Sequence, residues 1–248
     1  MERRAFPRDI TALVSAELER RGFLAAFTER TGGVSAAPYA SLNLGAEVGD
    51  LPDRVRDNQR LLAEALGIGS FATARQVHGT AVLRVTAGDP GPEDADVLMT
   101  DDTAVPLAVM TADCVPVALA SEHQGTLAAV HVGWRGLASG VVQQAMGLFP
   151  EPRDVAAAIG PAIGPCHYEV GPEVVEAVGR GAGEAVVTGS AEGPSMLDLP
   201  ATVEWLLRRL GAAVVEAAGV CTACEPTRFF SHRRDGVTGR QALVAVRL

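Results

Sequence analysis

Several features that mark common protein classes are missing from this sequence. It contains no lysine, and its 21 arginines are outnumbered by 30 acidic residues, which gives a net charge of −9. This charge argues against a broad cationic surface for nucleic acid or an anionic membrane, although clustered arginines could still bind a small anion. No apolar run approaches the roughly 20 residues that a membrane helix requires. We therefore expect a small-molecule substrate, and neither nucleic acid nor membrane as a partner.

Cysteine is also scarce. The 248 residues include only four cysteines, which are Cys114, Cys166, Cys221 and Cys224. Four thiols in a chain of this size do not make a disulfide framework, so buried, reactive or metal-binding thiols are expected. The first nine residues, from Met1 to Asp9, lack the apolar segment of a secretory signal. We accordingly expect a cytoplasmic protein.

The pattern of apolar runs predicts one α/β domain over residues 1–248, with mixed β-sheets flanked by helices. A hydrophobic fraction of 48% suffices for a full core, and no repeat, low-complexity tract or linker divides the chain. Residues 9–30 indicate either a helix or a pair of strands. Strands are predicted at 81–85, 96–100, 106–111, 115–120, 127–132, 156–161 and 214–221, and helices at 50–67, 137–146, from 172 onward and 200–210.

Two of these segments carry specific signals. In the helix at 50–67, Asp50 is placed to cap the first turn, Pro52 suits that turn, and Gly67 ends the helix. The segment 229–246 predicts two strands joined by the Asp235-Gly236 turn.

Three side chains that can bind a metal lie at strand ends or in the turns beside them. They are His78 in Gln76-Val-His-Gly79, Cys114 after Asp113, and His131 at the carboxyl end of the strand 127–132. Two imidazoles and one thiolate suit zinc, and copper less exclusively, and three protein ligands leave one tetrahedral position open. The separations (78 to 114 and 114 to 131) do not form a compact metal motif, so three unrelated buried residues fit the sequence equally well.

The remaining three cysteines give weaker evidence for a metal-binding, redox or catalytic role. Cys221-Thr-Ala-Cys224 is a single CxxC motif, and Pro226 prevents the helix that follows it in redox proteins. Semi-buried thiols or a disulfide are favoured there over a metal or redox role. Cys166 and His167 are adjacent, and on a strand their side chains would diverge, so a nucleophile–base pair is not expected.

Carboxylates and arginines near these positions suggest supporting roles. Asp113 precedes a candidate ligand, and Asp94 and Asp96 lie in a turn-like run. A carboxylate beside a metal-bound water could act as a general base or fix the tautomer of a histidine ligand, whereas most such aspartates are solvated turn residues or caps. The arginines of Ser231-His-Arg-Arg-Asp-Gly236, together with Arg240, could bind phosphate, or could simply form a solvated hairpin face.

Taken together, several motifs resemble the laccase-domain family, whose members are labelled polyphenol oxidase, purine nucleoside phosphorylase or peptidoglycan-editing factor. The resemblance runs from about Phe27 to the end of the chain. It rests on Ala40-Ser-Leu-Asn-Leu-Gly45, Gln76-Val-His-Gly79, Thr111-Ala-Asp-Cys-Val-Pro116, His131-Val-Gly-Trp-Arg-Gly136, Ile159-Gly-Pro161 and Phe229-Phe-Ser-His-Arg-Arg-Asp-Gly236, which occur in this order.

The resemblance implies an α/β domain with mixed sheets and a zinc ion held by His78, Cys114 and His131. It also implies phosphorolysis of adenosine, inosine, guanosine and methylthioadenosine, and hydrolytic deamination of adenosine. The partners would then be a purine nucleoside and phosphate.

On this hypothesis the catalytic residues are Cys114, Asp113 and His131. Zinc would activate water for attack at the purine C6 with the help of Asp113, and arginines such as Arg233 would hold phosphate for attack at the ribose C1′. Further substrate-binding residues are predicted to be Asn43, Arg135, Ser231 and Arg233. For Arg135, packing without substrate contact is left open.

Three alternatives remain at this stage. The chain could be an amidase that edits a nucleotide-linked wall precursor, with Cys114 as nucleophile and His131 as base. It could be a copper-dependent polyphenol oxidase, although five histidines are few for a multicopper centre. It could also be a metal-binding module without catalysis, which the open coordination position argues against.

Overall fold

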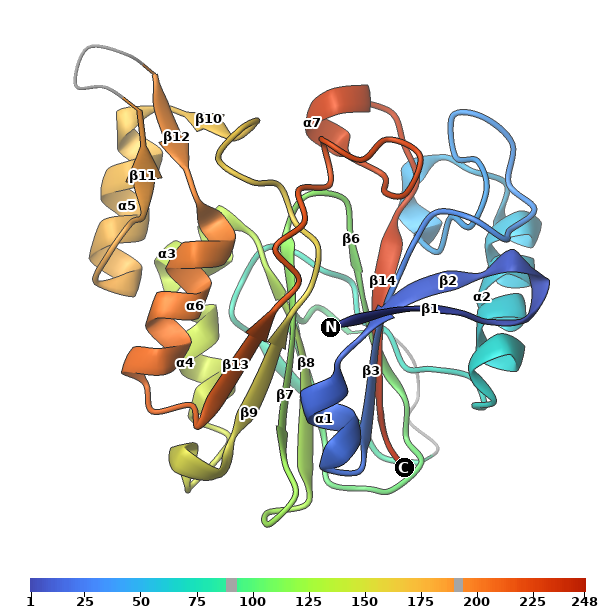
Figure 1. Ribbon diagram of the computed structural model, residues 1–248, viewed down its shortest axis with the longest axis horizontal. Coiled ribbons are helices and arrows are strands. Elements are labelled where there is room, and N and C mark those ends of the chain that lie inside the picture. The colour runs from blue at the N-terminus through green and yellow to red at the C-terminus, as the bar shows by residue number, and fades with distance from the viewer. Residues whose placement is uncertain (88–92, 190–193) are drawn as a thin grey trace.

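Two β-sheets pack face to face at the centre of the molecule (Figure 1). The structure, a computed structural model, describes residues 1–87, 93–189 and 194–248. The first sheet is antiparallel throughout, in the order β1 (Glu2–Ala5), β2 (Thr11–Val14), β3 (Phe23–Thr28), β14 (Gln241–Arg247) and β6 (Leu107–Thr111). The second sheet has the order β13 (Val214–Ala217), β9 (Ala156–Ile159), β7 (Val115–Ser121), β8 (Thr126–Val132), β5 (Val97–Thr100) and β4 (Val82–Arg84). Its outermost pairs are parallel and its inner pairs antiparallel, so this sheet is mixed.

Helices cover the outer faces of both sheets and make four layers in all (Figure 1). On the side of the mixed sheet lie α3 (Trp134–Ser139), α4 (Val141–Met146), α5 (Pro172–Ala182) and α6 (Leu199–Arg209). On the other side lies α2 (Pro52–Leu66). A small antiparallel sheet, β10 (Glu169–Val170), β12 (Ser195–Leu197) and β11 (Val187–Thr188), adjoins α5. The short elements are α1 (Ala16–Arg20), α7 (His232–Asp235) and the 3-10 turns η1 (Pro7–Asp9), η2 (Ala46–Val48) and η3 (Pro152–Asp154).

The alternation of side chains along β8 explains where the site forms. Ala128 and Val130 belong to the core beneath the helices, whereas Leu127 and Ala129 belong to the core between the sheets. Because successive side chains of a strand point to opposite faces, His131 also points between the sheets. The layer between the sheets is therefore apolar along most of its length and carries an imidazole where β8 ends.

The predicted fold class is confirmed: the chain is α/β, with mixed and antiparallel sheets flanked by helices. The predicted strands of the mixed sheet are present with small changes at their ends. Residues 9–30 contain the strands β2 and β3 with α1 between them. The segment 137–146 is broken into α3 and α4 because Gly140 has a left-handed backbone, with φ at +93°. Among the described residues no helix is long and apolar enough to span a membrane.

Two local predictions are wrong. Asp50 does not cap α2, whose N-cap is Leu51; its carboxylate instead accepts hydrogen bonds from Ser35 and Asn43. The predicted hairpin at 229–246 is a loop, the helical turn α7 and the single strand β14. The Ser231 hydroxyl accepts a hydrogen bond from the backbone of Arg234 and so starts a helical turn where a strand was predicted.

Candidate functional site

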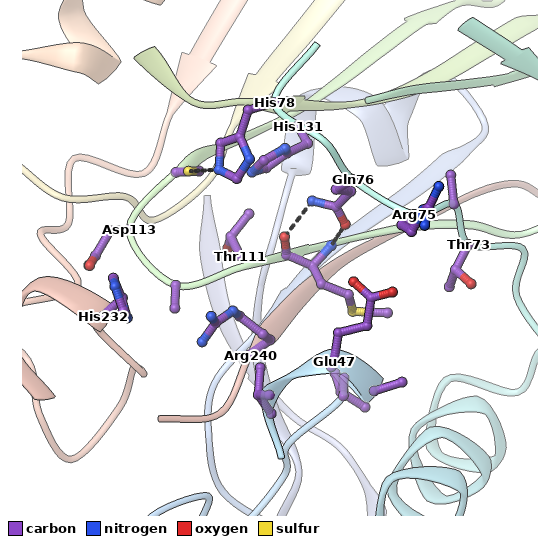
Figure 2. A pocket seen from close by; sticks show the side chains of 18 of the residues that line it. Glu47, Thr73, Arg75, Gln76, His78, Thr111, Asp113, His131, His232 and Arg240 are labelled. Atoms are coloured by element: carbon purple, nitrogen blue, oxygen red, sulfur yellow. Dashed lines mark hydrogen bonds between the residues drawn. The ribbon is translucent and has the colours of Figure 1, made fainter. Parts of the chain in front are cut away.

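His78, Cys114 and His131 come together at one end of the layer between the sheets. Their ligand atoms all lie within 4.8 Å of one another. The Sγ of Cys114 is 3.8 Å from Nε2 of His78, and the two imidazole rings meet edge to face with centroids 4.8 Å apart. Figure 2 shows the rings of His78 and His131 side by side. The three residues come from the turn before β4, the start of β7 and the end of β8, so the fold joins distant parts of the sequence.

A single buried carboxylate, that of Asp96, orders both histidines. It accepts hydrogen bonds from the backbone amides of Val77 (3.2 Å), His78 (3.0 Å) and Gly79 (2.6 Å), and from Nδ1 of His131 at 2.7 Å. Burial raises the pKa of Asp96, but these hydrogen bonds outweigh it and the net pKa is lowered. Because Nδ1–H of His131 donates to this carboxylate, Nε2 is the atom of the ring that is left to bind a metal.

The thiol of Cys114 and the imidazole of His131 shift each other's pKa. Burial opposes both shifts, but the attraction between the thiolate and the imidazolium dominates, and His78 and Asp96 add hydrogen bonds. The pKa of Cys114 falls to about 6, and that of His131 rises to about 9. Near neutral pH the cysteine is thus a thiolate, which is the form that binds metals and attacks electrophiles.

The surroundings of the three residues fit a metal ion. A Cβ atom added at Gly133 would lie 2.7 Å from Cδ2 of His78 and 3.2 Å from Sγ of Cys114, so only glycine lets these ligands approach each other here. Two imidazoles and a thiolate are ligands that zinc accepts, and three protein ligands leave a fourth position for water or substrate. The geometry therefore supports a metal centre with one open coordination position, and this position fits zinc and copper alike.

A cavity of about 620 Å³ borders this cluster (Figure 2). Its wall includes three guanidinium groups, those of Arg75, Arg233 and Arg240, together with His232. Arg75 is paired with the carboxylate of Asp94. Arg240 donates hydrogen bonds to the carbonyls of Thr238 and Gly239. Burial lowers its pKa, although the attraction of Cys114 and Asp113 opposes this effect.

Arg233 completes the cationic part of the wall. Its guanidinium donates to the carbonyl of Glu169 at 2.9 Å and lies 5.1 Å from the centre of the Tyr168 ring. Within the described residues, neither Arg233 nor Arg240 forms a salt bridge with a carboxylate. Two guanidiniums bonded only to neutral oxygens leave positive charge available for an anion in the cavity.

Comparison with known proteins decides the family. Residues 24–247 match the model of a family described as multi-copper polyphenol oxidoreductase laccase. The chain belongs to this family. The resemblance to the laccase-domain family is thus confirmed, and the matched range agrees with its predicted start near residue 27.

Relatives and solved structures agree with this assignment. The purine nucleoside phosphorylase YfiH of Shigella flexneri is 39% identical over 225 residues, covering 90% of this chain and 93% of that protein. A purine nucleoside phosphorylase of Streptomyces coelicolor is 42% identical over 224 residues, covering 87% and 92%. The crystal structure of a Neisseria meningitidis protein superposes with a TM-score of 0.86 at 37% identity, covering 95% and 98% of the two chains. That of YlmD from Geobacillus stearothermophilus gives 0.86 at 36% identity, covering 91% and 92%.

Asp113, from the family motif Thr111-Ala-Asp-Cys114, borders the cavity, but both of its carboxylate oxygens are already hydrogen bonded. Oδ1 accepts from the hydroxyl of Thr222 at 2.7 Å, and Oδ2 accepts from the backbone amide of Arg233 at 2.7 Å. The residue is buried and has φ at +98°. Its carboxylate therefore ties the start of β7 to the segments that carry Thr222 and Arg233.

Three other residues predicted from the family motifs lie outside the lining of the cavity. Ser231 is buried and caps α7. Asn43 is buried, and its Oδ1 accepts from the backbone amides of Gly45 (3.1 Å) and Arg240 (2.9 Å). Arg135 is exposed and lies over the ring of Trp134, with 4.4 Å between the guanidinium carbon and the ring centre. Substrate contact by these residues stays a prediction, whereas Arg233 does line the cavity.

Some cavity residues had no predicted role. The side chain of Gln76 donates to the carbonyl of Met110 at 2.8 Å and accepts from its amide at 2.7 Å, as the dashed lines in Figure 2 show. This pairing fixes the segment before His78 against β6. Glu47, Thr111 and Tyr168 also line the cavity. The family motif included Gln76, but nothing in its spacing showed that it binds backbone.

Proposed function

We propose that this protein is a metal-dependent purine nucleoside enzyme whose main reaction is phosphorolysis. One observation carries the proposal: a cavity of about 620 Å³ has a cluster of metal ligands at one wall and two guanidiniums without carboxylate partners at another. A nucleoside phosphorylase must hold a neutral nucleoside and a phosphate dianion together. The relatives from Shigella flexneri and Streptomyces coelicolor are both named purine nucleoside phosphorylases, which agrees with this chemistry.

Zinc is the proposed metal, held by His78, Cys114 and His131, with copper as the alternative. When bound, such an ion acts as a Lewis acid that polarises an oxygen atom of water or substrate. The protein contributes the orientation of its ligands, because Asp96 fixes both the turn of His78 and the tautomer of His131.

The cationic wall would position phosphate. In phosphorolysis a phosphate oxygen forms a bond to the ribose C1′, the bond from C1′ to the purine nitrogen breaks, and the purine leaves. Arg233 and Arg240 would bind the phosphate oxygens and reduce the repulsion that they experience. Asp113 would act as a positioning residue, since it holds the backbone of Arg233.

Hydrolytic deamination of adenosine would use the same cavity. Water adds to the purine C6 and ammonia leaves, so a group must accept the proton of water. Asp113 would be the general base that accepts this proton. An Asp113→Asn variant separates the two roles: loss of deamination alone supports a base, and loss of both reactions supports positioning.

The test is phosphate-dependent release of purine base from adenosine, inosine, guanosine and methylthioadenosine, measured together with zinc and copper content. We expect turnover with the unmodified protein, loss of about a hundredfold or more in Cys114→Ala, and loss with a chelator that added zinc reverses. His123→Ala removes an exposed histidine that does not line the cavity and serves as the control. Turnover that persists in Cys114→Ala would exclude this centre.

A second candidate function is favoured by the thiol itself. The pKa of Cys114 is lowered to about 6 beside His131, as a nucleophilic cysteine requires. The chain would then be an amidase that edits a nucleotide-linked wall precursor. A covalent acyl adduct on Cys114, seen by mass spectrometry and formed in the presence of chelator, would support the amidase over the phosphorylase. Oxygen consumption with a phenol after copper loading would support the polyphenol oxidase.

A further inference from the structure

A second group of metal-binding side chains lies away from the cavity lining. Cys166, His167, Cys221 and Cys224 have their ligand atoms all within 4.8 Å of one another. Sγ of Cys166 is 3.4 Å from Sγ of Cys224, and Nδ1 of His167 is 3.3 Å from Cys166, 3.5 Å from Cys224 and 3.9 Å from Cys221. Three thiols and one imidazole thus enclose one small space near the surface.

The prediction that the side chains of Cys166 and His167 diverge on a strand is wrong. The residues lie in the turn 165–167 rather than on a strand, so their side chains converge. The CxxC motif lies in a second turn after β13, where the amide of Cys224 donates to the carbonyl of Cys221. A parallel bridge between Ala162 and Cys221 brings the two turns together.

We infer that Cys166, His167, Cys221 and Cys224 hold a structural zinc ion, distinct from the centre in the cavity. Tetrahedral zinc with bonds of about 2.3 Å to sulfur and about 2.0 Å to nitrogen has edges of about 3.5–3.8 Å between its ligand atoms. The separations from His167 to the three sulfurs, at 3.3, 3.5 and 3.9 Å, agree with such edges.

The contacts around the cluster are those expected for a bound zinc ion. The backbone amide of Gly164 donates to Sγ of Cys221 at 3.2 Å, as outer-shell donors to metal-bound thiolates do. A Cβ atom at Gly164 would lie 3.3 Å from Cβ of Cys221 and 3.5 Å from Sγ of Cys166, so this glycine leaves the space in which the thiols converge. Three thiolates and a neutral imidazole would leave the zinc site with a net charge of about −1.

The two groups of ligands differ in what they can do. Four protein ligands close a zinc site and make it structural, whereas the three at His78, Cys114 and His131 leave it open. The closed site would join the segment between β9 and β10 to the segment after β13. The first of these segments carries Tyr168, and the second leads to Arg233, and both residues line the cavity. The ion would therefore fix the relative positions of two parts of the cavity wall without contacting substrate.

The experiment is metal analysis of the unmodified protein purified with zinc under reducing conditions. We expect about two zinc ions per chain, about one in Cys114→Ala, and about one in Cys224→Ser. Thr227→Ser changes an exposed residue of the same loop and should retain both ions. The melting temperature should fall in Cys224→Ser and not in Thr227→Ser. The number of zinc ions per chain is measured without an activity assay. A zinc content that contradicts this inference would therefore leave the proposed function unaffected.

Cobalt replacement in the Cys114→Ala protein gives a second measurement that does not require a cluster variant to fold. Tetrahedral cobalt with three thiolates should give strong charge-transfer absorption in the near ultraviolet. Absence of this band would overturn the proposal, and so would an unmodified protein that binds a single zinc ion which is lost in Cys114→Ala. So would a purified protein lighter by two hydrogen atoms with a bond between Cys166 and Cys224, since that disulfide consumes two of the ligands.

Discussion

Asp96 and His131 form a buried pair in which the carboxylate is 2.7 Å from Nδ1 of the imidazole. The same carboxylate binds three consecutive amides in the turn of His78. One side chain therefore sets the positions of two candidate metal ligands that are far apart in the sequence. The metal centre should consequently depend on a residue that does not contact the ion.

Replacing Asp96 by Asn should weaken zinc binding by about 10-fold to 100-fold, because the amide nitrogen would face backbone N–H groups that need an acceptor. Zinc affinity can be measured by competition with a chromogenic chelator. Asp94→Asn is the matched control, since Asp94 is exposed and pairs with Arg75. Equal weakening in both variants would contradict this role of Asp96.

Gly133→Ala should disrupt the same centre by steric contact. The added methyl group would lie 2.7 Å from the ring of His78, and such overpacking costs about 1–3 kcal/mol. We expect zinc affinity to fall by about tenfold or more while the fold is retained, as measured by chelator competition and circular dichroism. Gly69→Ala is the control, because a Cβ there meets no atom within 4 Å. Unchanged zinc affinity in Gly133→Ala would show that His78 is not held against this glycine.

Arg240→Gln should raise the KM for phosphate about 10-fold to 100-fold and leave the KM for the nucleoside nearly unchanged. The physical reason is the loss of hydrogen bonds between a half-buried guanidinium and a charged ligand, each of about 1.5–3 kcal/mol. Initial rates at varied phosphate and fixed inosine measure the effect. Arg180→Gln, at an exposed position on α5, should behave as the unmodified protein. A rise in the nucleoside KM alone would place phosphate elsewhere.

The buried carboxylate of Glu29 should make stability depend on acid pH. Burial raises its pKa, but hydrogen bonds from Arg3, Arg228 and Thr11 outweigh this, and the pKa falls from 4.5 to about 2. A carboxyl with a lower pKa in the folded state stabilises above its unfolded pKa and loses that stabilisation as pH falls. We therefore expect up to ~3 kcal/mol of stability to disappear progressively between about pH 5 and pH 2.

Urea unfolding at a series of pH values measures this dependence. Glu29→Gln should be less stable at pH 7 and should show a flatter profile in this range. Glu176→Gln removes an exposed carboxylate paired with Arg180 and should leave the profile unchanged. An identical slope in Glu29→Gln and the unmodified protein would assign the acid sensitivity to other carboxylates.

Much of the fold could be predicted from the sequence because its signals are local. Apolar runs bounded by turn residues identified the strands of the mixed sheet, and Gly67 correctly marked the end of α2. The tail was mispredicted for a physical reason. The adjacent aromatic residues Phe229 and Phe230 favour a strand by propensity, but the cap at Ser231 decided the conformation of the segment.

The candidate metal ligands could be predicted from the sequence, but the residues that support them could be predicted much less. His78, Cys114 and His131 could be chosen because metal ligands cluster at strand ends. Asn43 belongs to a family motif too, yet its amide is fully buried and holds backbone, and sequence does not distinguish these two uses of a polar residue. The cluster at Cys166 was missed because convergence of adjacent side chains depends on the turn at residues 165–167, which the preceding Gly164-Pro165 pair indicates.

The position of β14 has a consequence for how the protein folds. Its residue Leu243 pairs with Phe27 on one side and with Val109 on the other, so contacts across most of the chain must form before the antiparallel sheet is complete. Pairings of such high contact order form slowly. Arg240 immediately precedes this strand, so the cationic wall cannot assemble on a nascent chain that has not yet released residues 241–247. Catalytic competence should thus appear in one late step during refolding, together with closure of the sheet.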